Sequence, residues 1–467
     1  MRQKSDRSGT PRADALVSRE RILRAAEPLL SEGNASMDQV AAAAGVGRST
    51  LYRHFPTRAA LATAVAERAT DGADDGTAAG VAPIPLLAPA PPLEVTRILE
   101  DVPAHLIADQ LVAEARRVAG AAVGLYVVDI DGSALVRLAG SEDLPERLNR
   151  PPALGPEIVP EGVPGFAARL ARTLPRCTVT PLWLRGRVLG LLLCVGAPRA
   201  PLDDIAKQGA AALELANDYT DLIESARRRK PTTAAAEVQH HLLPPRIARI
   251  AGGQLAGGLL PSYEVGGDWF DFVENRDGAW LAIASASGNG ATAAGLSAAA
   301  LGALRAARRG GRDLVDAVLA IDDVVRGLGD PRFRVTAILA RWHAPTAQLA
   351  FVNCGHPPAR VVSRAGVLST LAGPRHPPLG SDKRPPTIRV ERARLSRGER
   401  LVLLTDGVSV RTTRSGGRFG ARGLRRAIAS ASPPTAAGTA MAIQHAVAES
   451  SPERLAQDAT FVVLAVD

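Results

Sequence analysis

The sequence contains few aromatic residues, few cysteines and no long apolar runs. Phe, Trp and Tyr together make up 3% of the 467 residues, so the hydrophobic cores must consist mainly of aliphatic side chains and alanine. The three cysteines lie far apart and show no CxxC spacing, which argues against a disulfide framework or a cysteine zinc site. We expect Cys177, Cys194 and Cys354 to be reduced core residues.

No segment has the character of a secretion signal or a membrane span. Residues 1–11 are polar and charged, without the apolar stretch of a signal peptide. The longest apolar runs, such as 188–195, have the length of a strand and are too short to cross a bilayer. We therefore expect a cytoplasmic protein with no membrane partner.

Length and composition predict a multidomain protein. A chain of 467 residues is too long for one ordinary domain, and its 46% hydrophobic content is enough to form folded cores. A linker rich in Asp, Gly, Ala and Pro spans 71–92, and a basic cluster lies at 227–231. The predicted domains are therefore 12–70, 93–226 and 231–467.

The first domain shows a helix-turn-helix pattern. Apolar residues follow helical spacing over 19–30, and Ser36 and Gln39 form a capping box for a short second helix. Gly45 supplies the turn before a third helix over 47–55. The pattern predicts an all-α head whose third helix enters the major groove of double-stranded DNA. The net charge of +9, mainly from arginine, permits such contact, although binding requires a local basic face.

Residues 37–65, MDQVAAAAGVGRSTLYRHFPTRAALATAV, resemble the DNA-binding domain of TetR-type repressors. The resemblance implies that Leu51 and Phe55 belong to the core. It also implies that six residues face phosphates and base edges: Arg48, Ser49, Thr50, Tyr52, Arg53 and His54. A palindromic operator needs two heads, so we expect a homodimer. A head that binds protein instead of DNA remains an alternative, which salt-dependent duplex binding would exclude.

The second domain, 93–226, alternates helix and strand patterns. We expect a helix over 95–118, strands over 120–129 and 134–138, a hairpin of 178–185 with 188–196, and one long helix over 202–229. PLWLRGRVLGLLLCVG at 181–196 resembles the closing hairpin of a GAF domain, which implies an α+β module. A small-molecule sensor and a dimerising scaffold without ligand both remain open. The long helix is a candidate for transmitting a signal to the third domain.

The third domain places aspartates at the ends of strands, beside glycines or turns. Asp268 follows two glycines, Asp406 follows a buried strand over 401–404, and Asp458 precedes the last strand over 459–466. Carboxylate oxygens in such positions are the ligands that Mg²⁺ and Mn²⁺ prefer. A metal pair could activate a water for attack on phosphorus.

Several motifs, in order, resemble the PPM-type metal-dependent protein serine/threonine phosphatases, in their sporulation-stage-II-E-like branch. They are HHLLPP (240–245), VGGDWFDF (265–272), GNG (288–290), FVNCGHPPA (351–359), PPLG (377–380) and LLTDGV (403–408). The resemblance implies an α/β/β/α sandwich over 231–467 and a two-metal site for Mn²⁺ or Mg²⁺. It implies Asp268, Asp406 and Asp458 as metal ligands, and Asp271 and Asn289 as structural or supporting residues.

One expected ligand is replaced. ASASGNG at 284–290 places Ser285 where the family has the aspartate that bridges both metals, and Val410 stands where a glutamate is expected. A neutral hydroxyl is a poor ligand for two cations, so the site is short of negative charge. Two functions therefore stay open: a phosphatase acting on a phosphoprotein such as an anti-sigma-factor antagonist, or a pseudophosphatase that regulates through DNA binding.

Overall fold

The computed structural model describes residues 21–26, 37–47, 50–51, 54–55, 61, 64–65, 102–174, 176–229, 231–262, 265–276, 278–382 and 387–467. The chain divides into two compact units, Met1–Ala90 and Pro91–Asp467, and each is described by itself. The linker predicted over 71–92 lies outside the described residues.

The N-terminal unit contains helix α2 (Met37–Ala44) and a helical segment at 21–26. Gly45 follows α2 with a φ of 62°, a left-handed conformation that glycine adopts readily, so the predicted turn is present. Leu51 and Phe55 are buried, as the sequence predicted. They share a small apolar core with Ile22, Leu23, Ala26, Val40, Ala41, Ala44, Leu61 and Ala64.

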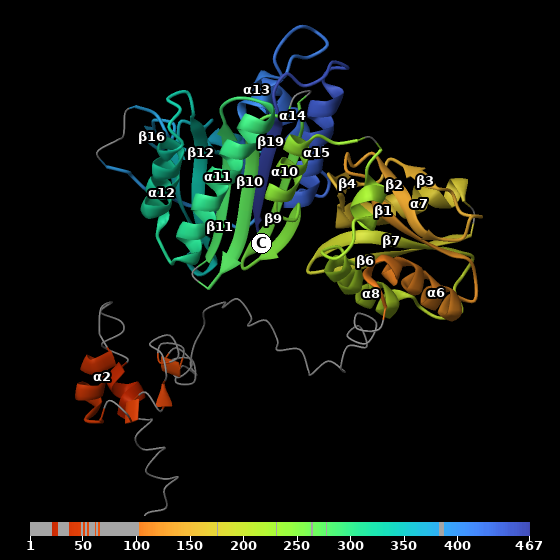
Figure 1. The fold of residues 1–467 in the computed structure, drawn as a ribbon, viewed down its shortest axis with the longest axis horizontal. Coiled ribbons are helices and arrows are strands. Elements are labelled where there is room, and N and C mark those ends of the chain that lie inside the picture. The colour runs from red at the N-terminus through yellow and green to blue at the C-terminus, as the bar shows by residue number, and fades with distance from the viewer. Residues whose placement is uncertain are drawn as a thin grey trace, which may run out of the picture. The chain divides into compact units, whose positions relative to one another are not determined.

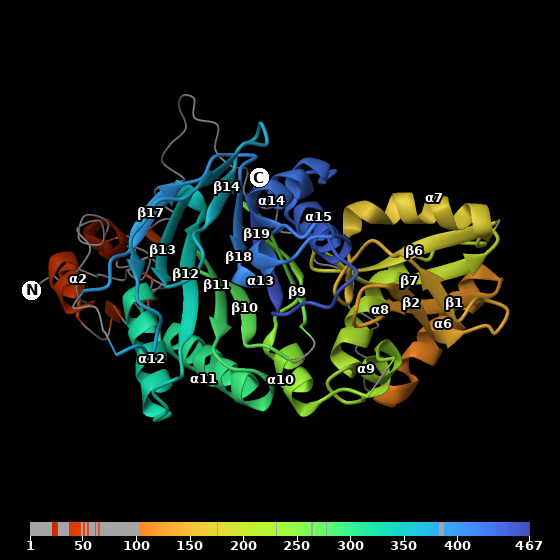
Figure 2. The ribbon, with the colours of Figure 1, turned by 90° about the horizontal axis from the view of Figure 1, so that it is seen from above.

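The middle domain is an antiparallel sheet with helices on both faces. Its strands are β1 (Val123–Val128), β2 (Ala134–Gly140), β3 (Arg147–Asn149), β4 (Ala153–Leu154), β5 (Glu157–Ile158), β6 (Cys177–Leu184) and β7 (Arg187–Val195). They pair in the order β3-β2-β1-β7-β5-β4, with β6 added to β7 as the predicted hairpin. Helices α6 (Ile107–Ala119) and α8 (Asp203–Ala216) cover one face and α7 (Val163–Thr173) the other (Figure 2).

The predicted long helix over 202–229 is wrong. Helix α8 ends at Ala216, and a separate short helix, α9 (Leu222–Arg227), follows after a break over 217–221. The break has the sequence Asn-Asp-Tyr-Thr-Asp, whose short polar side chains compete with helical backbone hydrogen bonds. The Thr220 hydroxyl, for example, accepts a hydrogen bond from the Leu222 backbone N–H at 3.3 Å. Of the first predicted helix, 95–118, residues 95–101 lie outside the described residues, and the 3₁₀ turn η1 (Ala104–Leu106) precedes α6 in the described part.

The C-terminal domain consists of two six-stranded sheets packed face to face (Figure 1). One sheet has the order β10-β11-β12-β13-β16, with β17 paired to β13; the other has the order β15-β14-β18-β19-β9-β8. The strands are β8 (Ile247–Ile250), β9 (Gly253–Leu260), β10 (Asp268–Asn275), β11 (Gly278–Ala286), β12 (Val335–His343), β13 (Gln348–Cys354), β14 (Arg360–Val362), β15 (Leu368–Thr370), β16 (Arg375–His376), β17 (Glu391–Arg394), β18 (Arg400–Leu404) and β19 (Ala459–Val466).

Helices cover the outer face of each sheet, as predicted for an α/β/β/α sandwich. The helices are α10 (Ala234–Leu242), α11 (Gly290–Arg309), α12 (Leu314–Gly327), α13 (Asp406–Val410), α14 (Gly420–Ser430) and α15 (Ala436–Glu449). Helices α11 and α12 pack on the β10–β13 sheet, and α14 and α15 on the other (Figure 2).

Strand β19 shows how the layers form, because successive side chains point to opposite faces of a strand. Phe461 and Val463 pack against α14 and α15, whereas Val462 and Leu464 lie between the sheets.

Polar contacts join the middle domain to the C-terminal domain. The buried Glu157 carboxylate accepts hydrogen bonds from the backbone N–H groups of Arg246 (2.9 Å) and Ile247 (3.2 Å). Gln444 of α15 donates to the Ala153 carbonyl at 3.1 Å. These contacts fix the β4–β5 hairpin against α15 and the start of β8. None of the helices in the described part of the chain has the length and apolar character needed to cross a membrane.

Candidate functional site

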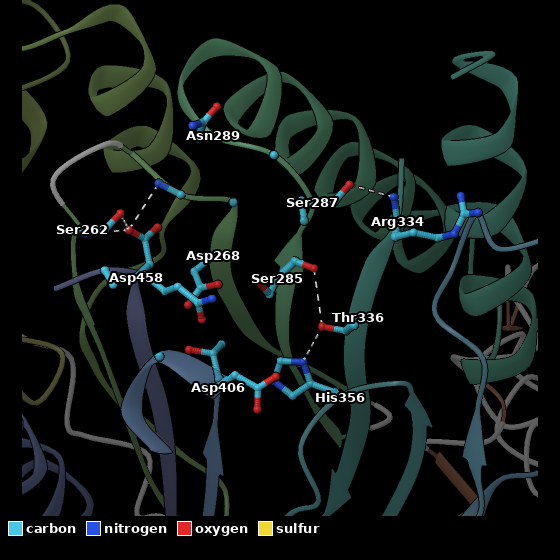
Figure 3. Close-up of a pocket in the computed structure, with 18 of the residues that line it drawn as sticks. Ser262, Asp268, Ser285, Ser287, Asn289, Arg334, Thr336, His356, Asp406 and Asp458 are labelled. Carbon is cyan, nitrogen blue, oxygen red and sulfur yellow. Dashed lines mark hydrogen bonds between the residues drawn. The ribbon is translucent and has the colours of Figure 1, made fainter. Parts of the chain in front are cut away.

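A cavity of about 410 Å³ lies where strands β10, β11 and β12 approach the start of α13 and the end of the loop before β19. It brings together five residues that the sequence analysis selected: Asp268, Ser285, Asn289, Asp406 and Asp458. Figure 3 shows the three aspartates around one space, with Ser285 beside Asp268. The strand register explains this placement, because Asp268 pairs with Ser285 and Ser285 pairs with Thr336 on the next strand.

Asp271 does not line this cavity. Its Oδ1 accepts a hydrogen bond from Arg305 at 2.9 Å and its Oδ2 accepts one from Arg308 at 2.7 Å. Both arginines belong to α11, so Asp271 holds this helix against β10. These contacts favour the structural one of the two roles that the sequence left open for Asp271.

Asp268 is a buried carboxylate with an unused acceptor. It is 4% exposed, and its Oδ2 accepts no hydrogen bond from the residues that the structure describes. Burial, together with the nearby Asp458 carboxylate, raises the pKa of Asp268 to about 7. An unpaired buried carboxylate oxygen is a position where a cation or a proton would be stabilised.

Asp458, in contrast, is saturated by protein donors. Its Oδ1 accepts hydrogen bonds from the backbone N–H and the hydroxyl of Ser262, both at 2.8 Å, and from the Gly266 N–H at 3.2 Å. Its Oδ2 accepts a hydrogen bond from the Gln239 side-chain amide at 2.6 Å. Gln239 also donates to the Asp268 carbonyl at 3.2 Å, so α10 is tied directly to the cavity wall.

Asp406 is the first residue of α13 and is exposed. The preceding Thr405 fixes the position of this turn: its N–H donates to the Thr460 carbonyl at 2.9 Å, and its hydroxyl accepts from the Thr460 N–H at 3.0 Å. The Asp406 carboxylate is therefore presented to the cavity from a firmly held backbone.

Glycines allow the backbone segments around the cavity to approach one another closely. A Cβ on Gly407 would lie 1.8 Å from the Asp458 carbonyl oxygen, and one on Gly267 would lie 2.3 Å from the Ala286 carbonyl oxygen. Both contacts are with backbone atoms, which cannot move aside as a flexible side chain could. The TDG and VGG glycines are thus required by packing.

We expect Gly407→Ala to destabilise the protein by about 1–3 kcal/mol or more, because the added methyl group overlaps the backbone of Asp458. The matched control is Gly295→Ala in α11, where a Cβ would meet nothing within 4 Å. That change should stabilise by about 0.5–1 kcal/mol, since alanine favours a helix interior. Thermal unfolding of both variants tests this, and equal effects would contradict it.

Thr336 and His356 extend the site beyond what the sequence analysis found. The Thr336 hydroxyl pairs with the Nδ1 of His356 at 3.1 Å and donates to the Ser285 carbonyl at 3.5 Å. His356 is 0% exposed, and its Nε2 has no partner among the described residues. Burial lowers the pKa of His356 to about 3, so the ring is neutral at physiological pH. The GHPP motif after a strand was the available signal, but it assigned the ring no role.

Among the described residues, the lining of the cavity contains no arginine that points toward the carboxylates. Arg334 lines its edge, but its guanidinium donates to the Phe333 and Gly380 carbonyls at 2.8 and 2.9 Å and points away from the aspartates (Figure 3). Asn289 is the N-cap residue of α11 and lies at the rim of the cavity. The described lining therefore offers acids, hydroxyls and backbone groups, with no guanidinium pair for a phosphate.

The side chains that line the cavity do not provide the ligands for a complete pair of divalent metal ions. Ser285 contributes no charge, both oxygens of Asp458 already accept hydrogen bonds, and Asp268 offers one free oxygen. Within the described ranges, no three His, Cys, Asp or Glu side chains are grouped so as to hold a metal ion. The predicted Mn²⁺ or Mg²⁺ centre is thus incomplete in its ligands.

The raised pKa of Asp268 predicts an unusual pH dependence for the metal-free protein. Between about pH 4 and pH 7 the native carboxyl keeps a proton that the unfolded chain has released, so stability falls as pH rises. Asp268→Asn cannot ionise and should be more stable than the native protein at pH 8, by up to about 4 kcal/mol. At pH 4 the native protein and the Asp268→Asn variant should unfold at the same temperature. Thermal unfolding in a chelator tests this, and an asparagine variant that is less stable at pH 8 would reject it.

In the head, the structure describes two of the six predicted DNA-facing residues. Thr50 and His54 are partly exposed, which leaves them accessible to a ligand. Arg48, Ser49, Tyr52 and Arg53 lie outside the described residues. Their assignment to DNA contact stays a prediction.

Comparison with known proteins finds family matches for two parts of the chain. Residues 275–467 match the family described as Stage II sporulation protein E (SpoIIE). Residues 22–65 match the family described as bacterial regulatory proteins, tetR family. Both resemblances that the motifs predicted are therefore confirmed, whereas the GAF-like resemblance of the middle domain stays a prediction. No curated protein matches the sequence.

Several solved structures are similar to parts of this chain. The SiaA-PP2C domain of Pseudomonas aeruginosa is 21% identical, with a TM-score of 0.44, over 55% of this chain and 100% of that chain. The RsbU and RsbW domains of a Mycobacterium tuberculosis protein are 21% identical, with a TM-score of 0.41, over 46% of this chain and 62% of that chain. A Bacillus subtilis SpoIIE structure with its phosphatase domain and a fragment of its regulatory domain is 14% identical, with a TM-score of 0.41, over 80% and 90%.

Proposed function

We propose that this protein is a DNA-binding regulator whose C-terminal domain keeps a phosphatase fold but hydrolyses phosphate esters slowly or not at all. The observation that carries the proposal is Ser285, which lies directly opposite Asp268 in the strand register. A hydroxyl at this position leaves the cavity without the carboxylate that would bridge two cations. Loss of a metal ligand usually costs orders of magnitude in activity.

The direct test is hydrolysis of a phosphoserine peptide by the full-length chain with Mn²⁺. We expect turnover at or near the rate of a metal-free control that contains chelator. Rapid Mn²⁺-dependent turnover by the native chain, abolished by Asp406→Asn, would overturn the proposal and establish a working phosphatase.

A working phosphatase is the second candidate, because two features of the cavity support it. Asp268 keeps a free buried oxygen, and Asp406 is exposed to the same cavity. In this case the substrate would be a phosphoprotein such as an anti-sigma-factor antagonist, and water and Ser285 would fill the missing ligand position.

For the head, we propose binding to double-stranded DNA. The tetR-family match over 22–65 and the buried Leu51 and Phe55 support this assignment. Duplex affinity measured by fluorescence anisotropy should fall steeply between about 50 and about 200 mM salt, because arginines replace counterions on the phosphates. Arg48→Ala combined with Arg53→Ala should weaken binding, and the exposed Arg312→Ala in the C-terminal domain should not. Salt-independent binding would exclude this role.

We also propose that the middle domain dimerises the chain. Three exposed apolar side chains lie between the end of α8 and the start of α9: Leu215 is 52% exposed, Tyr219 83% and Leu222 40%. Apolar surface of this kind is typical of protein contacts. A GAF-like pocket for a small ligand remains the alternative role of this domain.

A further inference from the structure

A second concavity lies on the C-terminal domain, away from the candidate site. It has a volume of about 590 Å³ and is bounded by the loop 411–419, α14 and the end of α15. It shares no lining residue with the cavity around Asp268. We call it the arginine groove, because its lining includes Arg414, Arg418, Arg422 and Arg426.

The arginine groove carries an uncompensated positive charge. All four arginines are exposed, and none forms an ion pair with a described residue. Glu449 is the one acidic residue among the described lining residues. Arg422 and Arg426 are four residues apart on α14, which places them on one face of this helix. Like charges at this spacing repel, so the pair is unfavourable unless an anion joins it.

Small residues form part of the lining of the groove. Gly417, Gly423, Ala427 and Ala446 contribute to its lining. A Cβ on Gly423 would lie 2.6 Å from the Phe419 ring, so this ring packs directly against the backbone of α14. These small residues add no long side chains to the groove, so they leave room for a ligand beside the arginines.

The loop that forms one wall is held in place by hydrogen bonds. The Thr413 N–H donates to the Gly417 carbonyl at 2.8 Å, the Phe419 N–H to the Arg411 carbonyl at 2.8 Å, and the Arg414 N–H to the Ser450 carbonyl at 2.9 Å. The buried Arg411 guanidinium donates to the carbonyls of Arg454 (2.9 Å) and Ser451 (3.0 Å). The wall is thus preformed, which lowers the cost of ordering it around a ligand.

We infer that the arginine groove binds a phosphate group carried on a peptide segment of a protein partner. Planar guanidinium groups form paired hydrogen bonds with phosphate oxygens, and several of them match a doubly charged phosphate better than a single carboxylate. The small residues in the lining leave room for an extended peptide backbone beside the phosphate. A DNA duplex is too wide to enter a groove of this size and would contact only its edge.

This inference goes beyond the proposed function, because it assigns binding of a phosphoprotein to a surface outside the candidate site. Recognition in the groove requires no hydrolysis at Asp268 or Asp406. The two proposals therefore fail separately. Active hydrolysis would reject the proposed function, and groove variants that keep their affinity for the phosphopeptide would reject the groove as its binding site.

The test measures binding of a fluorescein-labelled peptide library with a fixed central phosphoserine to the full-length chain, by fluorescence anisotropy. Arg422→Ala combined with Arg426→Ala is expected to weaken binding at least about tenfold, since each charge-assisted hydrogen bond contributes strongly. The matched control is Arg425→Ala, an exposed arginine on the same helix that does not line the groove. It should change affinity less than about threefold. Thermal unfolding should be unchanged in all three proteins.

Four outcomes would overturn the inference. The first is equal binding of the same library without phosphate. The second is an equal loss on Arg425→Ala, which would show a general charge effect. The third is competition by inorganic phosphate at the affinity of the phosphopeptide, which would make the groove a site for the free ion. The fourth is a loss of duplex DNA binding, without loss of peptide binding, on the double variant, which would make the groove a DNA contact.

Discussion

Ser285→Asp is expected to raise Mn²⁺-dependent hydrolysis of a phosphoserine peptide by about 100-fold or more over the native chain. The strand register places the introduced carboxylate opposite Asp268, at the wall of the cavity that also contains Asp406. The change supplies the anionic oxygen donor that the native cavity lacks. The rest of the fold, including the glycine contacts around the cavity, is already in place.

The same variant should show a metal-dependent stability. Two carboxylates directly opposite on neighbouring strands repel, so the metal-free variant should unfold at a lower temperature than the native protein. Addition of Mn²⁺ should raise its unfolding temperature more than that of the native chain, because a ligand that binds the folded state stabilises it. Differential scanning fluorimetry with and without chelator measures this difference.

Ser287→Asp is the matched control for this experiment. Ser287 also lines the cavity, but its hydroxyl accepts a hydrogen bond from the Arg334 N–H at 3.0 Å and lies away from Asp268. The Ser287→Asp substitution adds the same charge at the wrong position and should give no gain in hydrolysis. Asp406→Asn, added to Ser285→Asp, should remove the gained activity. If the native chain already turns over and Ser285→Asp changes nothing, the hydroxyl is sufficient and the second candidate function is correct.

Glu157→Ala is expected to destabilise the contact between the middle and C-terminal domains by about 3–5 kcal/mol. Glu157 accepts hydrogen bonds from two backbone N–H groups of the C-terminal domain, and its Oε1 also pairs with Arg187 at 3.1 Å. Its removal leaves a largely buried guanidinium and two buried N–H groups without this partner. We expect a lower unfolding temperature and faster proteolysis around 228–233, the segment between the domains.

Glu214→Ala provides the control, because Glu214 pairs with the same Arg187 but is 43% exposed. An exposed partner is largely screened by water, so its loss should cost about 1 kcal/mol or less. Equal destabilisation by the two variants would show that the loss comes from the ion pairs of Arg187 within the middle domain and not from the backbone contact of Glu157 with the C-terminal domain.

Much of the candidate site could be predicted from the sequence. Asp268, Ser285, Asp406 and Asp458 all line one cavity, and their positions at strand ends beside glycines were the signal. Gln239, Ser262, Thr336 and His356 were missed as site residues. Gln239 contacts Asp458 across 219 residues of sequence, a distance over which local patterns carry no information.

Local patterns also failed where two kinds of signal competed. The apolar spacing over 202–229 favours one helix, but the polar residues at 217–221 end it, so α8 and α9 are separate. The single long helix that was predicted to transmit a signal to the third domain is therefore interrupted. The domains are joined instead by contacts such as those of Glu157, which no periodicity indicates.

The sequence by itself predicted the α/β/β/α sandwich, its strands over 401–404 and 459–466, and Ser285 in place of a carboxylate, because motifs and alternation are local properties. The tertiary structure alone decided that Asp458 is saturated by Ser262, Gly266 and Gln239, that Asp268 keeps one free oxygen, and that arginines over 414–426 border a groove. Burial, hydrogen-bond saturation and concavity depend on which distant segments meet, and folding brings those segments together.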